Sequence, residues 1–363
     1  MADRLTVMGP REREVLELTR GVRQVSSAAS ARAWARLDAL TKPPRSLGRL
    51  EETAARISTV QDSITPSLDD AAAVVMAGDH GVVAEGVSAW PSEVTVQMVA
   101  NFSAGGAAIN QLARLQGMRL VVVDVGVAGD TSAMPGVVQA TVRPGTANMA
   151  LGPAMTREEA AEAMLVGAHL AQELIAGGVR AIAVGEMGIG NTTAASAVTA
   201  VLTGLPVDAV VGRGTGIDEM ALARKCSVIA RALQANQPRS GDPLGVLAAV
   251  GGLELAGMAG VVLGAAVSGA CAVADGFISG ASALAMVRFC PACAGYVFPS
   301  HLSVEPGHQA VLRALDLDPV LDLDMRLGEG TGAALAIGIM RAACAIMSGM
   351  ATFEEAGVSG RAE

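Results

Sequence analysis

The strongest constraint on the fold is a recurring pattern in which short, wholly apolar runs end in glycine-rich polar clusters. We expect strands at these runs, near 71–77, 119–125, 180–185, 208–212, 271–275 and 296–300. Helical stretches separate them, at 92–115, 156–177, 191–203, 218–235, 253–268 and 279–290. Apolar strands that alternate with helices are typical of a parallel sheet covered on both faces. The sequence therefore predicts an α/β fold with a Rossmann-like parallel sheet of about six strands.

The two ends of the chain differ from this middle part. Residues 1–65 have a polar, helical pattern, and a long apolar helix is expected at 331–349. We expect residues 1–65 and 331–363 to form a small helical cap from both chain ends. Residues 66–330 then form a large α/β domain that carries the active site.

Composition limits the partners of the chain. A formal net charge of −9 argues against binding to nucleic acid or to an anionic membrane. The uncharged run 255–274 is long enough for a membrane span, but it is rich in glycine and alanine. We expect a buried helix that leads into a buried strand there. The charged N-terminus does not resemble a signal peptide, so we expect a cytoplasmic protein with free thiols.

One cysteine pair could in principle bind zinc. Cys290 and Cys293 are separated by two residues and are followed by His301 and His308. These gaps do not match the common zinc-finger spacings, so we interpret the cysteines as packing residues. The chain also has no aspartate-rich magnesium cluster and no group of three histidines in its sequence pattern. We expect a site without a metal.

The richest polar cluster is "GEMGIGNTT", residues 185–193, which follows an expected strand. Gly188 and Gly190 open a turn, and Asn191 and Thr192 stand where a helix begins. Free backbone N–H groups at such a helix start can bind a phosphate. The spacing matches neither the dinucleotide nor the ATP-binding glycine motif. The alternative is an ordinary helix cap.

A second glycine-rich turn, "VGRGTGID", occupies residues 211–218. Gly212 and Gly214 flank Arg213, and Lys225 lies on the helix that follows. Both cations are close enough in sequence to serve an anionic ligand at this turn. For Lys225 the residues alone favour a solvated helix face.

Glu329 is the candidate acid–base residue. It stands between two glycines at the start of an apolar helix, in "MRLGEGTGAALA". If it is partly buried, its pKa should be raised, which suits a general base near neutral pH. The alternative is an ordinary acidic residue in the first turn of a helix. Asp79 and His80 also suggest acid–base work, but we expect them to have a structural role.

Taken together, the segments resemble one enzyme family. In chain order they are "TKPPRSLGRLE", "MAGDHGV", "EVTVQMVANFSAGGAAIN", "GEMGIGNTT", "VGRGTGID", "GGLELAGMAG", "DGFISGASAL", "SHLS" and "MRLGEGTGAALA", and they span residues 41–336. They are similar to the nicotinate-nucleotide–dimethylbenzimidazole phosphoribosyltransferases. That resemblance implies phosphoribosyl transfer from nicotinate mononucleotide to dimethylbenzimidazole, which gives α-ribazole phosphate and nicotinate. It further implies no cofactor and no metal, a homodimer, and a parallel sheet with a small helical domain.

The resemblance also assigns roles to residues. It implies that Glu329 is the general base, that Glu186 lies near the ribose and the base, and that Lys225 contacts the phosphoribosyl group. For the base pocket it implies the residues Gln97, Met187, Ser303 and Leu327.

Two positions depart from the family pattern. Arg45 stands where family members often have glycine, and Trp90 lies at the expected pocket entrance. These departures put the preferred base in question rather than the reaction. Transfer to another azole or to a phenolic base is therefore an alternative. A non-catalytic sensor of nucleotide or base with the same fold is a second alternative.

Overall fold

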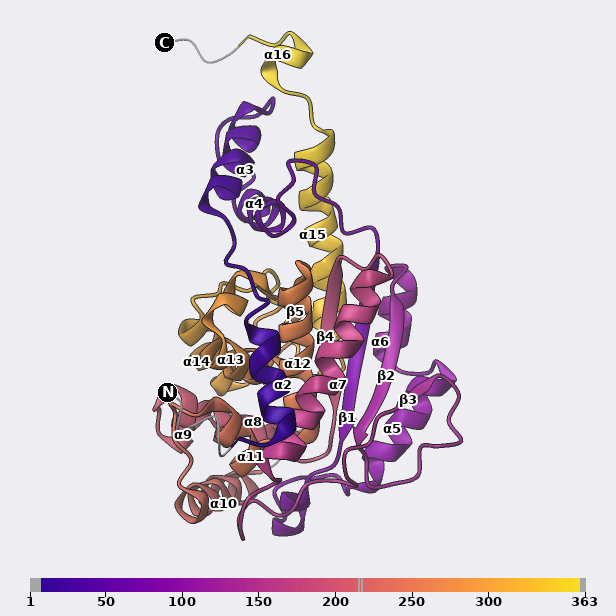
Figure 1. The fold of residues 1–363 in the computed structure, drawn as a ribbon, viewed down its shortest axis with the longest axis vertical. Helices are drawn as coiled ribbons and strands as arrows, with labels where there is room; N and C mark the ends of the chain where they lie inside the picture. The colour runs from indigo at the N-terminus through magenta and orange to yellow at the C-terminus, as the bar shows by residue number, and fades with distance from the viewer. Residues whose placement is uncertain (1–7, 215, 217, 360–363) are drawn as a thin grey trace.

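A six-stranded parallel sheet forms the centre of the molecule (Figure 1). The computed structural model describes residues 8–214, 216 and 218–359. The strands are β1 (Ala71–Gly78), β2 (Arg119–Gly126), β3 (Val137–Gln139), β4 (Ala181–Met187), β5 (Cys271–Ala274) and β6 (Val297–Pro299). Their order is β3-β2-β1-β4-β5-β6, and every neighbouring pair is parallel. The chain reverses its direction of winding between β1 and β4, where open α/β sheets bind ligands.

The sheet is covered by helices on both faces because its strands are apolar on both faces. Every residue of β1 is buried. Alternate side chains such as Val74 and Met76 belong to one hydrophobic core, and Ala73 and Val75 belong to a second. The first core is covered by α7 (Arg157–Ala176), α8 (Asn191–Thr203), α11 (Pro243–Val250), α12 (Leu253–Ser268) and α13 (Phe277–Phe289). The second is covered by α5 (Glu93–Ala104), α6 (Ala108–Leu115) and α15 (Thr331–Gly349).

The fold class is confirmed, but one expected strand is wrong. Residues 208–212 do not join the sheet. The segment forms the short helix α9 (Val207–Val210), which packs through Val210 against Ala200 and Ala310. The sixth strand is instead β3, a three-residue edge strand that pairs only with β2. Such a short strand is too weak a pattern to stand out in the sequence.

Several helix boundaries also differ from expectation. The expected helix 92–115 is two helices, α5 and α6, because Gly105 ends the first with a left-handed φ of 80°. Helices α10 (Glu219–Asn236) and α15 lie close to where we expected them. The helices α11 and α14 (Pro306–Leu315), the 3₁₀ helices η1 (Gly81–Glu85) and η2 (Pro291–Tyr296), and the terminal α16 (Phe353–Ala356) were not anticipated.

The uncharged run 255–274 is a buried helix and a buried strand, as expected. It comprises nearly all of α12, which is buried along most of its length, and β5. Within the part of the chain that the structure describes, one helix, α15, has the length and composition to cross a membrane. Half of its most apolar window is buried inside the protein, where it packs against the sheet.

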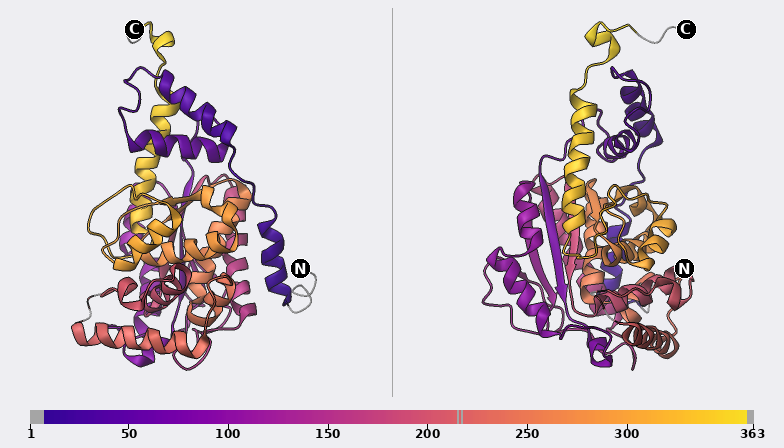
Figure 2. Two further views of the ribbon diagram at one scale, coloured as in Figure 1. Left: turned by 90° about the vertical axis from the view of Figure 1, so that its left-hand side faces the viewer. Right: turned by 180° about the vertical axis from the view of Figure 1, so that it is seen from behind.

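The helices at the two chain ends meet above the sheet (Figures 1 and 2). The helices α3 (Ser27–Ala39) and α4 (Arg49–Gln61) share a small core with the last turns of α15, through Leu37, Ala54 and Met347. In contrast, α2 (Pro10–Thr19) lies against α7, and the first half of α15 lies against the sheet. The expected cap of residues 1–65 and 331–363 therefore includes segments that pack on the sheet and helices of the large domain. Its boundaries stay a prediction.

Candidate active site

A cleft lies at the carboxyl ends of β4, β5 and β6. Its walls are the β4–α8 turn, the start of α13 and two loops, at 301–305 and 326–328. A second hollow adjoins it and shares Gly214, Glu305 and Arg326 with the first. The residues that line the first cleft include Glu186, Met187, Gly188, Asn191, Thr192, Asp275, Phe277, His301, Ser303 and Leu327.

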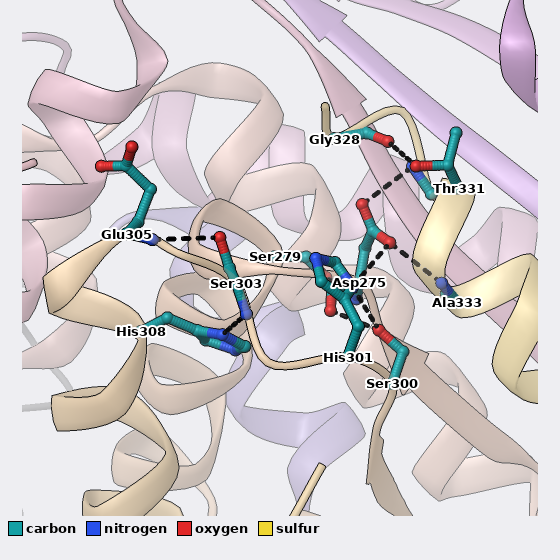
Figure 3. Close-up of polar contacts among 11 residues, drawn as sticks. Asp275, Ser279, Ser300, His301, Ser303, Glu305, His308, Gly328, Thr331 and Ala333 are labelled. Atoms are coloured by element: carbon teal, nitrogen blue, oxygen red, sulfur yellow. Dashed lines mark hydrogen bonds and ion pairs between the residues drawn. The ribbon is translucent and has the colours of Figure 1, made fainter. Parts of the chain in front are cut away.

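The backbone around Glu329 has an unusual shape. Gly328, Glu329 and Gly330 all have left-handed φ angles, of 86°, 63° and 85°. Glycine adopts this region without strain, but glutamate does so at a cost. The buried carboxylate of Asp275 fixes the turn by accepting hydrogen bonds from the N–H groups of Gly330 (3.2 Å) and Ala333 (2.9 Å) (Figure 3). The same carboxylate caps the start of α15.

Close packing fixes the turn from the other side. A Cβ atom on Gly185, in β4, would lie 2.5 Å from the backbone of Glu329. The hydroxyl of Thr331 donates to the carbonyl of Gly328 (2.8 Å) (Figure 3). The position of Glu329 is therefore set by contacts of its backbone rather than by contacts of its side chain.

The side chain of Glu329 is buried and has an available oxygen. The residue is 6% exposed, and its Oε2 has no hydrogen-bond partner among the described residues. Burial raises the pKa of Glu329, although a hydrogen bond from the backbone N–H of Ile109, in the first turn of α6, opposes this. A buried carboxylate with a raised pKa and a free acceptor oxygen is suited to accept a proton.

Three further acidic side chains are buried near Glu329. Burial, followed by the charges of Asp275, Glu254 and Glu329, raises the pKa of Glu186 to about 8. Burial likewise raises the pKa of Asp275 to about 7. The carboxylate of Glu186 also accepts hydrogen bonds from the side chain of Asn191 and from the backbone N–H of Glu329. The cluster is therefore an acidic, water-poor environment.

Two histidines are paired with this cluster: His301, whose Nδ1 lies 3.7 Å from Oδ1 of Asp275, and His80. The Nε2 of His80 lies 2.5 Å from Oε1 of Glu254, and both side chains are buried. Burial alone would lower the pKa of His80, but the charge of Glu254, the hydrogen bond with Glu254 and the charge of Asp79 together outweigh burial, and the pKa is raised. His80 does not line the cleft, which agrees with the structural role expected for it.

The first glycine-rich turn connects β4 to α8. Gly190 has a left-handed φ of 95° and precedes the helix, whose first residues are Asn191 and Thr192. Gly188 passes so close to β1 that a Cβ would lie 2.3 Å from the carbonyl oxygen of Gly78. The turn therefore places the first N–H groups of α8 at the cleft.

Lys225 joins the two glycine-rich turns. It is 1% exposed, and its Nζ donates to Oγ1 of Thr192 (2.9 Å) and to the carbonyl of Gly212 (3.3 Å). Burial lowers the pKa of Lys225 to about 8, although the charge of Glu305 opposes this. The structure thus excludes the solvated helix face that the residues alone favoured for Lys225.

The second turn borders the adjoining hollow. The backbone N–H of Gly214 donates to Oε1 of Glu305 (2.9 Å). Arg213 is half-exposed and pairs with Glu219 at the start of α10. Gly212, Arg213 and Gly214 therefore all lie at the edge of this hollow.

The four residues expected in the base pocket do not all lie there. Met187, Ser303 and Leu327 line the cleft. Ser303 is held there because its N–H donates to Nδ1 of His308 (3.0 Å) (Figure 3). Gln97 is exposed on α5 and is not a lining residue of the cleft, so its assignment stays a prediction. The buried face of α5 instead presents Thr95, whose Oγ1 accepts from the N–H of Ile189 (3.1 Å).

Sequence reasoning missed five polar residues that line the cleft, namely Asp275, Ser279, His301, Glu305 and Arg326. Asp275 follows the buried strand β5, and its position at a carboxyl end was a usable signal. Arg326 lies in the segment that contains Glu329, whereas Glu305 lies on a loop with no motif to mark it. In the described residues no group of three or more His, Cys, Asp or Glu side chains could hold a metal. The metal-free site stays a prediction.

Comparison with known proteins identifies the family. A family model described as "Phosphoribosyltransferase" matches residues 22–358. The nicotinate-nucleotide–dimethylbenzimidazole phosphoribosyltransferase of Chloroflexus aggregans is 55% identical over 335 residues, which cover 92% of this chain and 95% of that protein. The chain belongs to this phosphoribosyltransferase family.

Other members of the family agree in sequence and in structure. The enzyme of the same name from Thermus thermophilus is 55% identical over 329 residues, which cover 91% of this chain and 98% of that protein. A crystal structure of the Thermus thermophilus phosphoribosyltransferase superposes with a TM-score of 0.88 at 52% identity, and it covers 93% of this chain and all of that chain. The family resemblance of the sequence segments is thereby confirmed over nearly the whole chain.

Proposed function

We propose that the protein transfers the phosphoribosyl group of nicotinate mononucleotide to dimethylbenzimidazole, giving α-ribazole 5′-phosphate and nicotinate. The observation that carries this proposal is the buried Glu329, whose Oε2 has no hydrogen-bond partner among the described residues. Glu329 is not itself a lining residue of the cleft, but it directly follows Gly328, which is one. Names of the relatives that match over most of the chain support the same reaction.

Glu329 acts in this proposal as the general base. One ring nitrogen of the azole attacks the anomeric carbon of the ribose, and the N–H proton of the other nitrogen passes to Oε2 of Glu329. The C–N bond to nicotinate breaks, and its electron pair neutralises the pyridinium nitrogen. The leaving group therefore needs no acid, and the single proton released is accounted for by Glu329. The hydrogen bond from Ile109 orients the carboxylate for this step.

The two glycine-rich turns bind the nucleotide in this proposal. The backbone N–H of Thr192, at the start of α8, faces the phosphoribosyl group with the positive end of the helix dipole. The backbone N–H of Asn191 donates to the carbonyl of Gly188 (3.1 Å), so Asn191 takes part through its side chain. Lys225 adds a positive charge between the turns. Gly188, Gly190, Gly212 and Gly214 let the backbone approach the ligand closely, and Arg213 stands at the outer edge.

The acidic cluster complements the charge of the reacting centre. The nicotinate ring carries a positive charge in the mononucleotide, and positive charge develops on the ribose ring as its bond to nitrogen breaks. Glu186 and Asp275 line the cleft, and although burial raises the pKa of both, the positive charge of the bound nucleotide favours their ionised form. In this proposal Met187, Ser303 and Leu327, which line the cleft, surround the azole, and Gln97 of α5 contacts it from outside the lining residues.

The nature of the base, the oligomeric state and the location are part of the same proposal. Met187, Leu327 and Phe277 give the cleft apolar walls that also suit another azole or a phenol. One methyl or hydroxyl group changes the discrimination between two bases by about 1–3 kcal/mol.

A homodimer in the cytoplasm is supported by the resemblance of the sequence, and sedimentation at several concentrations tests the dimer.

A direct assay tests the proposed function. Purified protein is incubated with nicotinate mononucleotide and dimethylbenzimidazole in the presence of EDTA, and nicotinate release is followed by chromatography. Release that depends on the azole and survives EDTA is the expected result. Release with adenine or a phenol but not with dimethylbenzimidazole would change the substrate and keep the mechanism. No release with any base would contradict the proposal and favour the sensor alternative.

A further inference from the structure

A pair of cysteines lies at the edge of the sheet opposite the active site. Cys290 follows α13, and Cys293 lies within η2, the 3₁₀ helix that leads into the amino end of β6. The cleft lies at the carboxyl end of the same strand, so the pair is separate from the site described above. The function proposed above uses neither thiol.

The turn holds the two cysteines at a distance that suits a disulfide. The backbone N–H of Cys293 donates to the carbonyl of Cys290 (3.0 Å), which closes a four-residue turn. The end Cα atoms of such a turn lie within about 7 Å, and disulfides need about 4.4–6.8 Å. The two side chains also meet, because the Cys293 thiol donates a hydrogen bond to the Cys290 sulfur.

The two thiols have different environments. The Cys290 sulfur additionally accepts hydrogen bonds from the N–H groups of Ala292 and Cys293, at the start of η2. The bond from the Cys293 thiol, together with these N–H groups, outweighs burial and lowers the pKa of Cys290 to about 7, while the pKa of Cys293 is raised. Cys290 is 8% exposed and Cys293 is 0% exposed. Cys290 is therefore the more acidic and the more exposed of the two thiols, and Cys293 is the protected partner.

A segment that leads to the helical cap covers this turn. We call residues 20–26, which join α2 to α3, the strap. The Cys290 thiol donates a long hydrogen bond to the carbonyl of Thr19, just before the strap (3.9 Å). The hydroxyl of Tyr296 donates to the carbonyl of Arg23 (2.9 Å), and Val25 packs against Gly295. The cysteine turn and the strap thus form one contact surface.

We propose that Cys290 and Cys293 form an oxidisable dithiol, which a peroxide converts to an intramolecular disulfide and which a dithiol reductant restores. The Cys290 thiolate attacks one oxygen of hydrogen peroxide, the O–O bond breaks, and a sulfenic acid and one water form after protonation. The Cys293 thiol then attacks the sulfenic sulfur, so that an S–S bond forms and a second water leaves. Two thiols lose two electrons, and one peroxide gains them. The disulfide removes the thiol proton that Cys290 shares with Thr19, which loosens the strap.

Cys226 provides an internal control for reactivity. It is more exposed than Cys290, but burial, followed by the charge of Asp208, raises its pKa above the ordinary value of 9.0. Cys290 therefore has the larger thiolate fraction near neutral pH, because its pKa is lowered and that of Cys226 is raised. We expect Cys290 to react with peroxide faster than Cys226, although Cys226 is more exposed.

Mass spectrometry of the full-length protein tests this. The protein is treated with hydrogen peroxide at pH 7, blocked with N-ethylmaleimide and digested with trypsin, which releases residues 289–313 as a peptide with both cysteines and no other. After peroxide treatment, we expect this peptide to carry no maleimide group and to be two hydrogens lighter than the unlabelled dithiol peptide. Reduction with dithiothreitol before blocking should restore both maleimide groups. Retention of two maleimide groups while Cys226 is oxidised would overturn the proposal.

Two variants separate the roles of the two thiols. In Cys293→Ser, Cys290 should stop at the sulfenic acid, which dimedone labels. In Cys290→Ser, Cys293 should stay reduced. Equal labelling of the two variants would overturn the assignment of Cys290 as the attacking thiol. Thermal melting confirms that each variant is folded, and the wild-type measurement is decisive if one is not.

Native digestion with trypsin tests the link to the strap. Cleavage after Arg20 and Arg23 should be several-fold faster in the oxidised protein than in the reduced protein. Cys290→Ser treated with peroxide is the matched control and should not change. Equal cleavage of oxidised and reduced wild-type protein would overturn the link between the disulfide and the strap.

Discussion

Replacing Glu329 by glutamine removes the proposed proton acceptor while the shape of the side chain is kept. The turn around this residue is fixed by backbone contacts with Asp275 and Gly185, so the substitution leaves its position unchanged. A glutamine oxygen can also still accept the hydrogen bond from Ile109. Substrate binding should therefore be retained, and the effect should fall on the chemical step.

The expected loss of activity follows from the role of Glu329 as general base. A positioned general base contributes about 10²–10⁴ in rate, which equals about 3–5 kcal/mol in activation free energy. Because Oε2 has no other partner among the described residues, no neighbouring group compensates for its loss. We expect kcat to fall by about 10²–10⁴, with less than about a threefold change in KM for either substrate.

Steady-state assays of nicotinate release from pH 5 to pH 9 measure this. In the wild type, activity should fall as the pH drops through the raised pKa of Glu329, because the protonated carboxyl cannot accept a proton. In Glu329→Gln that dependence should be absent. Glu329→Asp is the matched control, since it keeps the charge but withdraws the carboxylate, and it should lose less activity. A kcat of Glu329→Gln within tenfold of the wild type would refute the reasoning.

Three further predictions concern the surroundings of this residue. Lys225→Met should raise KM for nicotinate mononucleotide by about 10- to 100-fold, since a charged hydrogen-bond donor contributes about 1.5–3 kcal/mol, and titration calorimetry checks it. Because burial raises the pKa of Glu186 to about 8, the folded state holds a proton that the unfolded chain releases near pH 4.5. The free energy of unfolding should therefore fall between about pH 5 and pH 8, and urea unfolding of Glu186→Gln should show a gain of roughly 1–4 kcal/mol at pH 8. Gly185→Ala should cost about 1–3 kcal/mol in thermal unfolding and lower kcat, whereas Gly152→Ala, with open space around it, should do neither.

The layered fold could be predicted because its signal is repeated along the chain. Strands β1, β2, β4, β5 and β6 are apolar runs followed by polar clusters, and each was recognisable by itself. The segment at 207–210 has the same composition but forms a helix. Packing against α8 and α14 makes this segment helical, and the composition of the segment does not reveal that packing.

The candidate site was predictable where residues are marked by glycines. Glu329 and Asn191 lie next to glycines that have a left-handed φ, and Thr192 follows Asn191. Glu305 has no such neighbour, and its contact with Gly214 joins residues distant in sequence.

Arg45, one of the two positions that depart from the pattern implied by the family resemblance, has a positive φ. At 63° this backbone favours glycine, so an arginine there is strained. Arg45 offsets the strain by stacking its guanidinium 3.5 Å from the centre of the Trp34 ring and by pairing with Asp38. The substitution lies in the helical cap and leaves the cleft unchanged.

The helix α15 connects the helical cap rigidly to Glu329, the proposed general base. It starts two residues after Glu329 and ends among the cap helices, and its 19 residues give a length of about 28 Å. A rigid rod of this length that pivots at its middle by about 5° moves each end by about 1 Å. A displacement of that size at a reacting group can cost about 10²-fold in rate. Contacts made by the cap far from the cleft can therefore adjust the rate of the reaction without touching a substrate.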